Sequence, residues 1–449
     1  MSTRTGKRTA VIGGGMAGSA AAKKLIASGR EVVIYESADG LGGRARSWHR
    51  PEIEPNVGIN LMYVSFYSLM TELISEYGLE SELQKLSSNI YISDKGKAIA
   101  LSPDSVFSPL TYKHVSLRDR LAFLSTTIKQ VRNKSQIDFF DPIKSAPLDD
   151  GLSAAQWGYQ QLGRRGFDFM LRPQVEGFWN FASEDVSAVH AKGLLAWMGG
   201  SGFYVFRNGM QIIAEKNAEG AELRLAHEVT DVQMAGTGLR VTAAREGGDP
   251  VTETFDELVL ATPAPIAAKL TAALPPEVVG DDARRFMESQ RYEPALSVSY
   301  LVDVGTLPSE AHIVAGGPGD QPLRNMITYP RKVRDEQGRL VDKLLVFAYP
   351  GRANTKRLLG LPQAEQFAAV APWLKTLWSD FSGRAEPFQI AERPYGFPIP
   401  APGRYRQAVQ VMEQQGAPVV LAGDYFNSPT TEAALLSGFR AAEALTQTD

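Results

Sequence analysis

The chain has 449 residues, no cysteine and a formal net charge of −3, with 44% hydrophobic and 22% charged residues. This length exceeds what one compact core holds, so we expect two or more lobes. The lack of a basic block leaves no electrostatic footprint for nucleic acid, and with no cysteine and five scattered histidines we predict no metal site.

The N-terminus carries Arg4, Lys7 and Arg8, but the apolar stretch that follows is too short for a signal peptide. The sequence has no run of about 18 apolar residues that would span a membrane. We therefore predict a cytoplasmic protein. Residues 117–131 are amphipathic with a cationic flank, so a peripheral membrane contact is the alternative to a core-facing helix, which the pattern favours.

The first predicted elements are a strand, a turn, a helix and a second strand. An apolar strand over 8–12 leads into the turn 13–18 (GGGMAG), a helix covers 19–28, and a strand over 31–35 ends at Glu36. This order is typical of the unit that binds dinucleotides in α/β proteins.

Each residue of this unit has a physical role. Gly13 permits the tight turn, Gly15 lets a pyrophosphate approach the backbone, and Gly18 lets the helix pack on the strand. The helix N-terminus offers free N–H groups to phosphates. Glu36 lies 18 residues beyond Gly18, close to the spacing of a carboxylate that bonds a ribose 2′-hydroxyl.

A second motif, Gly42-Gly43-Arg44, follows the acid. Here the chain resembles the flavoprotein family of amine oxidases, protoporphyrinogen oxidases and carotenoid desaturases, which carry GGR just after the ribose acid. The resemblance implies that FAD is the cofactor and that these residues lie against its diphosphate and flavin side. Arginine suits this role because its fork of donors matches phosphate oxygens. Residues 54–60 resemble the family's next segment, which runs beside the flavin.

Further along, the pattern predicts a helix over 65–77, a hairpin over 89–102 with its turn at 94–96, and mostly helical structure from 103 to 204. The densest aromatic cluster lies within 167–206. Aromatic residues usually fill cores, but in the resembling family a helical lobe at this place covers the substrate cavity.

The next stretch resembles the one that returns the chain to the FAD domain. The pattern predicts a helix over 211–219, a strand pair over 222–232, a hairpin over 239–255 and an apolar strand over 257–262. By resemblance, the backbone of Val229 contacts the adenine.

Strand-like runs at 295–302, 344–349 and 387–392 predict an antiparallel sheet that forms the floor of a substrate lobe. Tyr349 and Tyr395 are candidate pocket aromatics and the candidate catalytic residues.

The C-terminal segment carries the second strong signal, a strand over 418–422, the pair Gly423-Asp424 and a helix over 431–445. It resembles the family's closing motif, in which a GD or GE pair precedes a helix entered through EGA, with Ala433 here in place of the glycine. The resemblance implies that Asp424 contacts the ribityl or diphosphate region and that the helix N–H groups face the N1–C2=O edge of the flavin. A helix N-terminus there favours the negative charge of reduced flavin.

We therefore predict an α/β fold, with a discontinuous Rossmann-type FAD-binding domain (1–95, 205–265 and 411–449), a helical substrate lobe (96–204) and a substrate-domain antiparallel sheet (266–410). The predicted cofactor contacts are Gly13, Gly15, Met16, Ala17, Gly18, Glu36, Ser37, Gly42, Gly43, Arg44, Val229, Gly423, Asp424, Thr431, Glu432 and Ala433.

The resemblance implies an FAD-dependent oxidoreductase that removes hydride from a C–H bond of a largely apolar substrate, with oxygen or a quinone as electron acceptor. The sequence AGDY at 422–425 favours a desaturase. An amine oxidase is an alternative, although the strand over 295–302 lacks the lysine that such enzymes usually carry. Two further alternatives are an isomerase with no net redox change and a flavin-binding protein without catalysis. The oligomeric state is left open.

Overall fold

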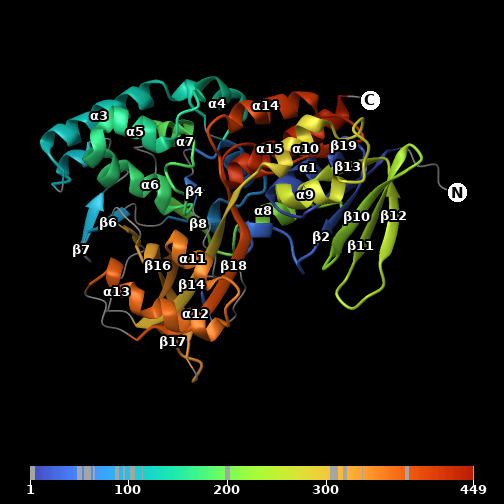
Figure 1. Ribbon diagram of the computed structural model, residues 1–449. Helices are drawn as coiled ribbons and strands as arrows, with labels where there is room; N and C mark the ends of the chain where they lie inside the picture. Colours follow the sequence, from blue (N-terminus) through green and yellow to red (C-terminus); the bar gives the residue numbers. More distant parts are fainter. Residues whose placement is uncertain are drawn as a thin grey trace.

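The computed structural model describes residues 6–47, 53–54, 62–63, 66–85, 90–94, 97–101, 107–113, 115–138, 140–197, 203–303, 312–316, 321–335, 337–379 and 384–447 (Figure 1). The stretch 55–60, which we expected beside the flavin, and the turn residues 95–96 lie outside the described residues.

A five-stranded parallel sheet forms the centre of one half of the molecule, in the order β19-β13-β1-β2-β9. Its strands come from distant parts of the chain: β1 Arg8–Ile12, β2 Glu31–Glu36, β9 Glu222–Leu225, β13 Glu257–Leu260 and β19 Val419–Leu421. The strands β1 and β13 are buried throughout because helices cover both faces. The predicted α/β class is confirmed.

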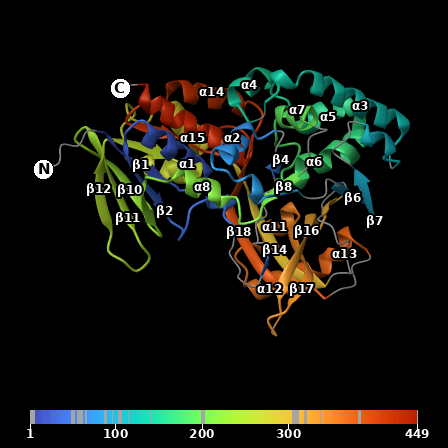
Figure 2. The same cartoon turned by 180° about the vertical axis from the view of Figure 1, so that it is seen from behind.

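Helices from both ends of the chain cover one face of this sheet. These are α1 (Met16–Ala27) and α15 (Thr431–Thr446), which lie side by side in Figure 2. The other face carries α9 (Ala264–Thr271), α10 (Asp281–Glu288) and α14 (Arg404–Gln414). We had predicted only strands between 266 and 410, so these helices are additions.

The helices α1 and α15 run parallel and are staggered. A Cβ added at Gly438 would lie 2.0 Å from the carbonyl oxygen of Ala17, so the two helices touch there. Further along both helices, Lys24 pairs with Glu443 at 3.1 Å. Because Gly438 is level with Ala17, α15 begins about six residues, or roughly 9 Å, before α1 does.

A three-stranded antiparallel sheet, β10 (Glu228–Ala235), β11 (Gly238–Ala244) and β12 (Val251–Phe255), extends from the parallel sheet. The hairpin predicted over 239–255 is confirmed. The strand pair predicted over 222–232 is wrong, because β9 joins the parallel sheet beside β2 while β10 belongs to the second sheet. The chain turns between them at Ala226, whose φ is 55°.

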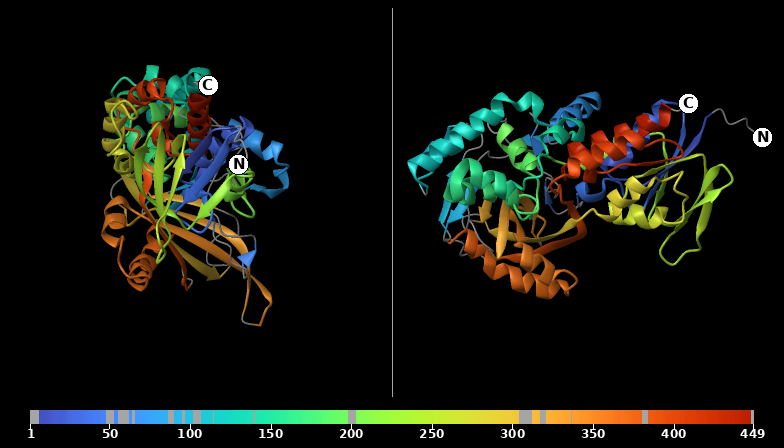
Figure 3. Two further views of the ribbon diagram at one scale, coloured as in Figure 1. Left: turned by 90° about the vertical axis from the view of Figure 1, so that its right-hand side faces the viewer. Right: turned by 45° about the horizontal axis from the view of Figure 1, so that its top comes forward.

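The helical lobe occupies the opposite end of the molecule (Figure 3). Its main helices are α3 (Leu117–Arg132), α5 (Ala154–Gly166), α6 (Arg172–Gly177) and α7 (Ala188–Ala196), with a π-helical turn over Phe167–Leu171. Among the described residues of 103–204, the predicted mostly helical structure is confirmed, except that Phe203 and Tyr204 begin the strand β8 (Phe203–Phe206). In the part of the chain that the structure describes, no helix combines the length and apolar character needed to cross a membrane.

A large sheet lies below the helical lobe, in the order β18-β14-β17-β16-β15-β6-β7, with β3 (Ile53–Glu54) paired to β16. Its short strands are β6 (Ile90–Asp94), β7 (Lys97–Leu101) and β15 (His312–Gly316). The predicted strands at 295–302, 344–349 and 387–392 are confirmed as parts of β14, β17 and β18, and the predicted hairpin is the β6–β7 pair. The longest members are β14 Tyr292–Asp303, β16 Leu323–Arg334, β17 Leu340–Pro350 and β18 Glu386–Pro398. One face packs on α11 (Arg352–Leu358), α12 (Gln363–Val370) and α13 (Leu374–Leu377).

The contact at Gly438 leads to a stability prediction. A glycine-to-alanine change inside a helix normally gains about 0.5–1 kcal/mol, but in Gly438→Ala the new Cβ meets backbone 2.0 Å away. We expect the steric clash to outweigh this gain, so that Gly438→Ala lowers the free energy of unfolding by about 1–3 kcal/mol, measured by chemical denaturation. Gly416→Ala is the matched control, because nothing lies within 4 Å of its added Cβ. Equal stability of the two variants would contradict the tight packing.

Candidate active site

Two glycine-containing loops meet at the carboxyl end of β1. The N–H of Gly42 donates to the carbonyl of Gly14 at 2.9 Å, and Gly15 and Gly42 form an isolated β-bridge. A Cβ at Gly43 would lie only 3.2 Å from the Cα of Gly15. The predicted glycine turn and the GGR motif therefore form one bare backbone surface, which a larger side chain would fill.

The first turn of α1 opens onto this surface. Gly15 is its N-cap, no side chain caps the turn, and the turn contains no acid. Met16 and Ala17 are buried at its start, and a Cβ at Gly18 would meet the carbonyl oxygen of Gly13 at 1.9 Å. The helix N-terminus therefore keeps its positive end for an anionic group.

Glu36 lies beside the same turn at the end of β2. Its carboxylate accepts from the N–H of Gly14 and from the N–H of Ala38, both at 2.8 Å. The Ser37 hydroxyl donates to it at 3.3 Å. A carboxylate has about four lone-pair sites, so these bonds leave acceptor capacity for a hydroxyl group.

Val229 lies near Glu36 on the strand β10. The N–H of His227, two residues before it, donates to the Glu36 carbonyl at 2.9 Å. Val229 is buried, and the register of β10 shifts immediately after it. The two ends of the predicted adenosine site thus lie on neighbouring segments.

Arg44 joins three distant segments of the chain. Its guanidinium donates to the Asp424 carboxylate at 2.7 Å and to the Gly396 carbonyl at 2.9 Å. Burial lowers the pKa of Arg44, but the Asp424 carboxylate outweighs this and holds the pKa above its ordinary value. Arg44 therefore stays charged beside the glycine surface.

The closing motif is held in place from within α15. The Ser437 hydroxyl accepts from the N–H of Gly423 at 2.7 Å. The Thr430 side chain caps α15 by accepting from the N–H of Ala433 at 3.2 Å, and Thr431 is the first helical residue. The start of α15 is thus fixed just beyond Asp424.

Glu432 points away from this surface. Its carboxylate accepts from the Ser68 hydroxyl at 3.1 Å and from the N–H groups of Leu69 at 2.7 Å and Met70 at 3.0 Å. It thereby caps α2 (Ser68–Glu76), which has no cap of its own. Burial raises the pKa of Glu432 to about 7, although these hydrogen bonds act in the opposite direction. Only its backbone remains for a bound group.

Asn427 is a residue that sequence reasoning missed. It is 3% exposed, yet among the described residues neither its side-chain nitrogen nor its oxygen has a hydrogen-bond partner. Such a group is costly unless a ligand or water satisfies it. It lies between Asp424 and the start of α15, and no local sequence pattern marks it.

Tyr395 lies next to Gly396, whose carbonyl binds Arg44, and it is 38% exposed. Its ring packs against Tyr292 with 5.5 Å between centroids. Burial raises the pKa of Tyr292, so this tyrosine stays neutral. Tyr349 belongs instead to an apolar cluster with Phe178 and Phe203. The structure therefore places the two candidate tyrosines in different surroundings.

The aromatic cluster of the helical lobe reaches the start of α15. Trp179 donates its indole N–H to the carbonyl of Pro429 at 3.1 Å. Its ring lies 6.2 Å from Phe181 and 4.6 Å from His190. Burial lowers the pKa of His190 to about 3, so this imidazole is neutral. The N-terminus of α15 thus borders aromatic, uncharged side chains.

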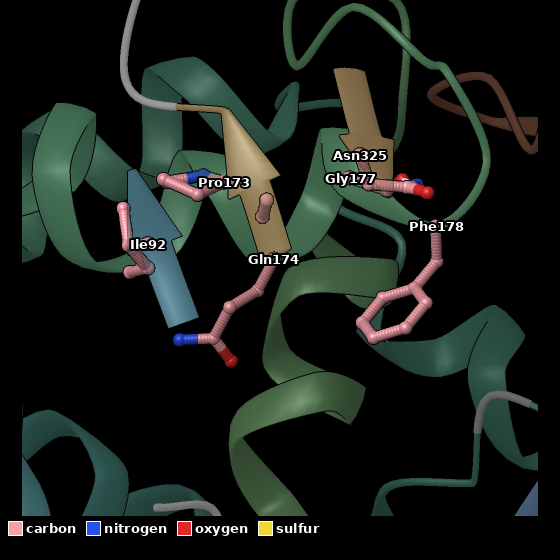
Figure 4. Close-up of a pocket in the computed structure, with 7 residues that line it drawn as sticks. Ile92, Pro173, Gln174, Gly177, Phe178 and Asn325 are labelled. Atoms are coloured by element: carbon pink, nitrogen blue, oxygen red, sulfur yellow. Dashed lines mark hydrogen bonds between the residues drawn. The ribbon is translucent and has the colours of Figure 1, made fainter. Parts of the chain in front are cut away.

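The small pocket shown in Figure 4 lies between α6 and the large sheet and has room for about one water molecule. It is therefore too small to be the site. Its lining comprises Ile92, Pro173, Gln174, Gly177, Phe178, Ala315 and Asn325.

Comparisons with known proteins agree with this geometry. The profile of the family described as "Flavin containing amine oxidoreductase" matches residues 16–446. A putative protoporphyrinogen oxidase from Exiguobacterium sp. 255-15 has the same fold, with a TM-score of 0.73, 16% identity and 100% of both chains covered.

Two curated relatives match over shorter stretches. The zeta-carotene desaturase of Synechocystis sp. is 25% identical over 171 residues, which cover 35% of this chain and 34% of the relative. The mitochondrial protoporphyrinogen oxidase of Nicotiana tabacum is 29% identical over 188 residues, which cover 41% of this chain and 35% of the relative. The matched stretches thus span about a third of the relatives' length.

The family profile defines a flavin-containing protein, and the fold agrees with it. The chain belongs to the family of flavin-containing amine oxidoreductases.

The raised pKa of Glu432 predicts a pH-dependent stability. The folded chain holds this proton more tightly than the unfolded chain does, so the free energy of unfolding falls as pH rises from 4.5 through about 7. The loss is roughly 3 kcal/mol, and we expect Glu432→Gln to remove it in denaturation curves across this range. Glu443→Gln, on the exposed side of the same helix, is the control. An unchanged slope in Glu432→Gln would refute the assignment.

Proposed function

We propose that this chain is an FAD-dependent oxidoreductase that removes hydride from a C–H bond of a largely apolar substrate. The observation that carries the proposal is the stagger of two parallel helix N-termini, at Met16 and Thr431, with the Arg44–Asp424 pair joining their loops. Two positive helix ends that are offset by roughly 9 Å along the helix axes suit a cofactor with a diphosphate at one position and an electron-accepting ring at the other.

Several of the predicted cofactor residues have a role in this proposal. The α1 N-terminus and the bare backbone of Gly15 and Gly43 receive the diphosphate. Glu36 accepts from the ribose hydroxyls, and the backbone near Val229 borders the adenine. The unpartnered amide of Asn427 supports a polar group bound nearby. When bound, FAD supplies the acceptor for the hydride.

The chain's own contribution at the reacting end is electrostatic and steric. The N-terminus of α15, which begins at Thr431, offers a positive end where negative charge develops on reduction. Trp179 and Phe181 keep water from this end because they are aromatic and closely packed. The substrate would lose a hydride to the cofactor and a proton from the adjacent carbon to a base, and we assign no side chain to the second transfer.

The apolar substrate is favoured over an amine by β14. Its residues Tyr292–Asp303 include no lysine, and the side chains turned toward the apolar cluster of Tyr349 include Ser297 and Ser299. A serine hydroxyl carries no permanent charge and is not a strong base, unlike the lysine that amine oxidases usually carry on this strand. We also propose oxygen or a quinone as the electron acceptor, and retain the division into an FAD-binding domain, a helical lobe and a sheet lobe.

Removing the Arg44 charge should weaken FAD binding. Arg44→Met deletes the donors aimed at Asp424 and leaves that buried carboxylate unpaired. Loss of a charged hydrogen bond costs about 1.5–3 kcal/mol, so we expect the Kd for FAD to rise roughly 10- to 100-fold, measured by titrating the apoprotein. Arg46→Met is the control, since Arg46 pairs with the exposed Asp39. A Kd unchanged by Arg44→Met would argue against the site.

The substrate class is tested by anaerobic bleaching of the bound flavin. A panel of amines is compared with a panel of polyenes, terpenoids and tetrapyrroles. Bleaching by the apolar panel alone is the expected result. Bleaching by amines would contradict the proposal and favour an amine oxidase, with Tyr395 as the first residue to mutate. Flavin that nothing bleaches would favour the isomerase.

A further inference from the structure

One face of the large sheet carries buried polar groups that the function proposed above does not use. On the side that packs against Phe178 and Phe203, two side chains have an atom with no hydrogen-bond partner in the described part of the chain: the Asn325 amide oxygen and the Tyr329 hydroxyl. Both residues are 5% exposed or less. A buried polar atom without a partner is unfavourable unless a ligand or water satisfies it.

Arg331 lies on the same face and is 4% exposed. Its guanidinium donates to the carbonyl of the neighbouring Pro330 at 2.8 Å, and its Nε has no acceptor. It lies 5.1 Å from the ring centroid of Tyr329. Burial lowers the pKa of Arg331 to about 10, while Tyr329 acts in the opposite direction. Within the described ranges, no carboxylate pairs with it.

Other buried cations in the chain are compensated. Arg30 pairs with Glu257 at 2.7 Å, and Arg324 pairs with Glu176 at 2.9 Å. Arg404 lacks an acid but donates to the Phe286 carbonyl and the Ser289 hydroxyl. A buried charge without a partner is unfavourable. We therefore expect an anion to bind at Arg331.

Lys343, directly opposite Arg331 on β17, is a second cation, and it is itself compensated. It pairs with Asp303 at 2.6 Å at the exposed edge of the sheet. The positive character at Arg331 therefore remains, surrounded by the apolar residues of the same face, which include Ile327, Tyr329, Val333, Leu345 and Phe347.

We propose that Arg331 binds the anionic end, a carboxylate or a phosphate monoester, of an otherwise apolar substrate. A guanidinium fork matches both groups. Arg331 lies six residues along β16 from Asn325, the residue that pairs with Tyr349. The anionic end of the substrate would therefore lie about 20 Å from Tyr349 along the strand direction. The inference rests on the proposed function and narrows its substrate to an extended apolar acid.

The test measures equilibrium binding of three probes to the full-length purified protein by calorimetry. The probes are hexadecanoate, hexadecyl phosphate and hexadecan-1-ol, which share one apolar chain. Wild type should bind at least one anion more tightly than the alcohol, and the tighter anion identifies the head group. Equal affinity for all three would overturn the proposal.

Three variants locate the effect. Arg331→Met keeps the apolar stem and should weaken anion binding roughly 10- to 100-fold while leaving alcohol binding unchanged. Arg331→Lys should recover part of the loss. Lys332→Met is the matched control, because Lys332 is exposed and pairs with Asp342 at 3.2 Å on the surface. Unchanged anion affinity in Arg331→Met would also overturn the proposal.

Folding of the variant and the proposed function are checked separately. Arg331→Met removes an unpaired buried charge, so its melting temperature should equal or exceed that of the wild type. A loss of anion binding at an unchanged melting temperature is therefore not caused by unfolding. Flavin content and bleaching are measured on the same samples. Missing flavin would refute the proposed oxidoreductase, whereas selective anion binding that depends on Arg331 would still identify the anion site.

Discussion

The ion pair between Arg44 and Asp424 is the contact on which the site depends. It connects the loop after the first strands with the loop before the last helix, and through the Gly396 carbonyl it also holds the end of β18. Because Asp424 is buried, removing Arg44 leaves that carboxylate without its charge partner. The pair thus helps to fix the cofactor end and the substrate sheet to one another.

Close backbone contacts make that pair possible. Gly18 lets α1 approach the turn at Gly13, and Gly438 lets α15 lie against the carbonyl of Ala17. With the helices in contact, Ser437 reaches the N–H of Gly423 and orients the closing loop. The stagger of the two N-termini follows from this packing, so the electrostatic character of the site is a consequence of where glycines allow helices to meet.

Local pattern sufficed for the elements that carry this architecture. The alternation of an apolar strand, a glycine turn and a helix predicts β1, α1 and β2, and the closing motif predicts β19 and α15, because these signals lie within a few residues of one another. The sheet to which β9 or β10 belongs depends on the turn at Ala226 and on distant partners, so the pattern over 222–232 was misread. No local sequence pattern marks Asn427, Tyr292 or Arg331. What distinguishes each of them is whether its side chain has a partner far away in the chain.

Burial and charge indicate which part of the molecule would contact the substrate. An aromatic cluster at Trp179 meets the start of α15, and the sheet face near Tyr349 carries polar atoms that nothing in the described chain satisfies. An apolar ligand with few polar groups accounts for both observations, because such a ligand fills the aromatic space and satisfies the isolated donors and acceptors.

The central claim is that two staggered helix N-termini hold FAD. The most direct measurement is the visible absorption spectrum of the purified protein, with chromatographic identification of the cofactor released on denaturation. The account predicts a flavin spectrum and FAD in an equimolar amount. Release of FMN or of a nicotinamide dinucleotide, or a protein that neither contains nor takes up FAD, would contradict it.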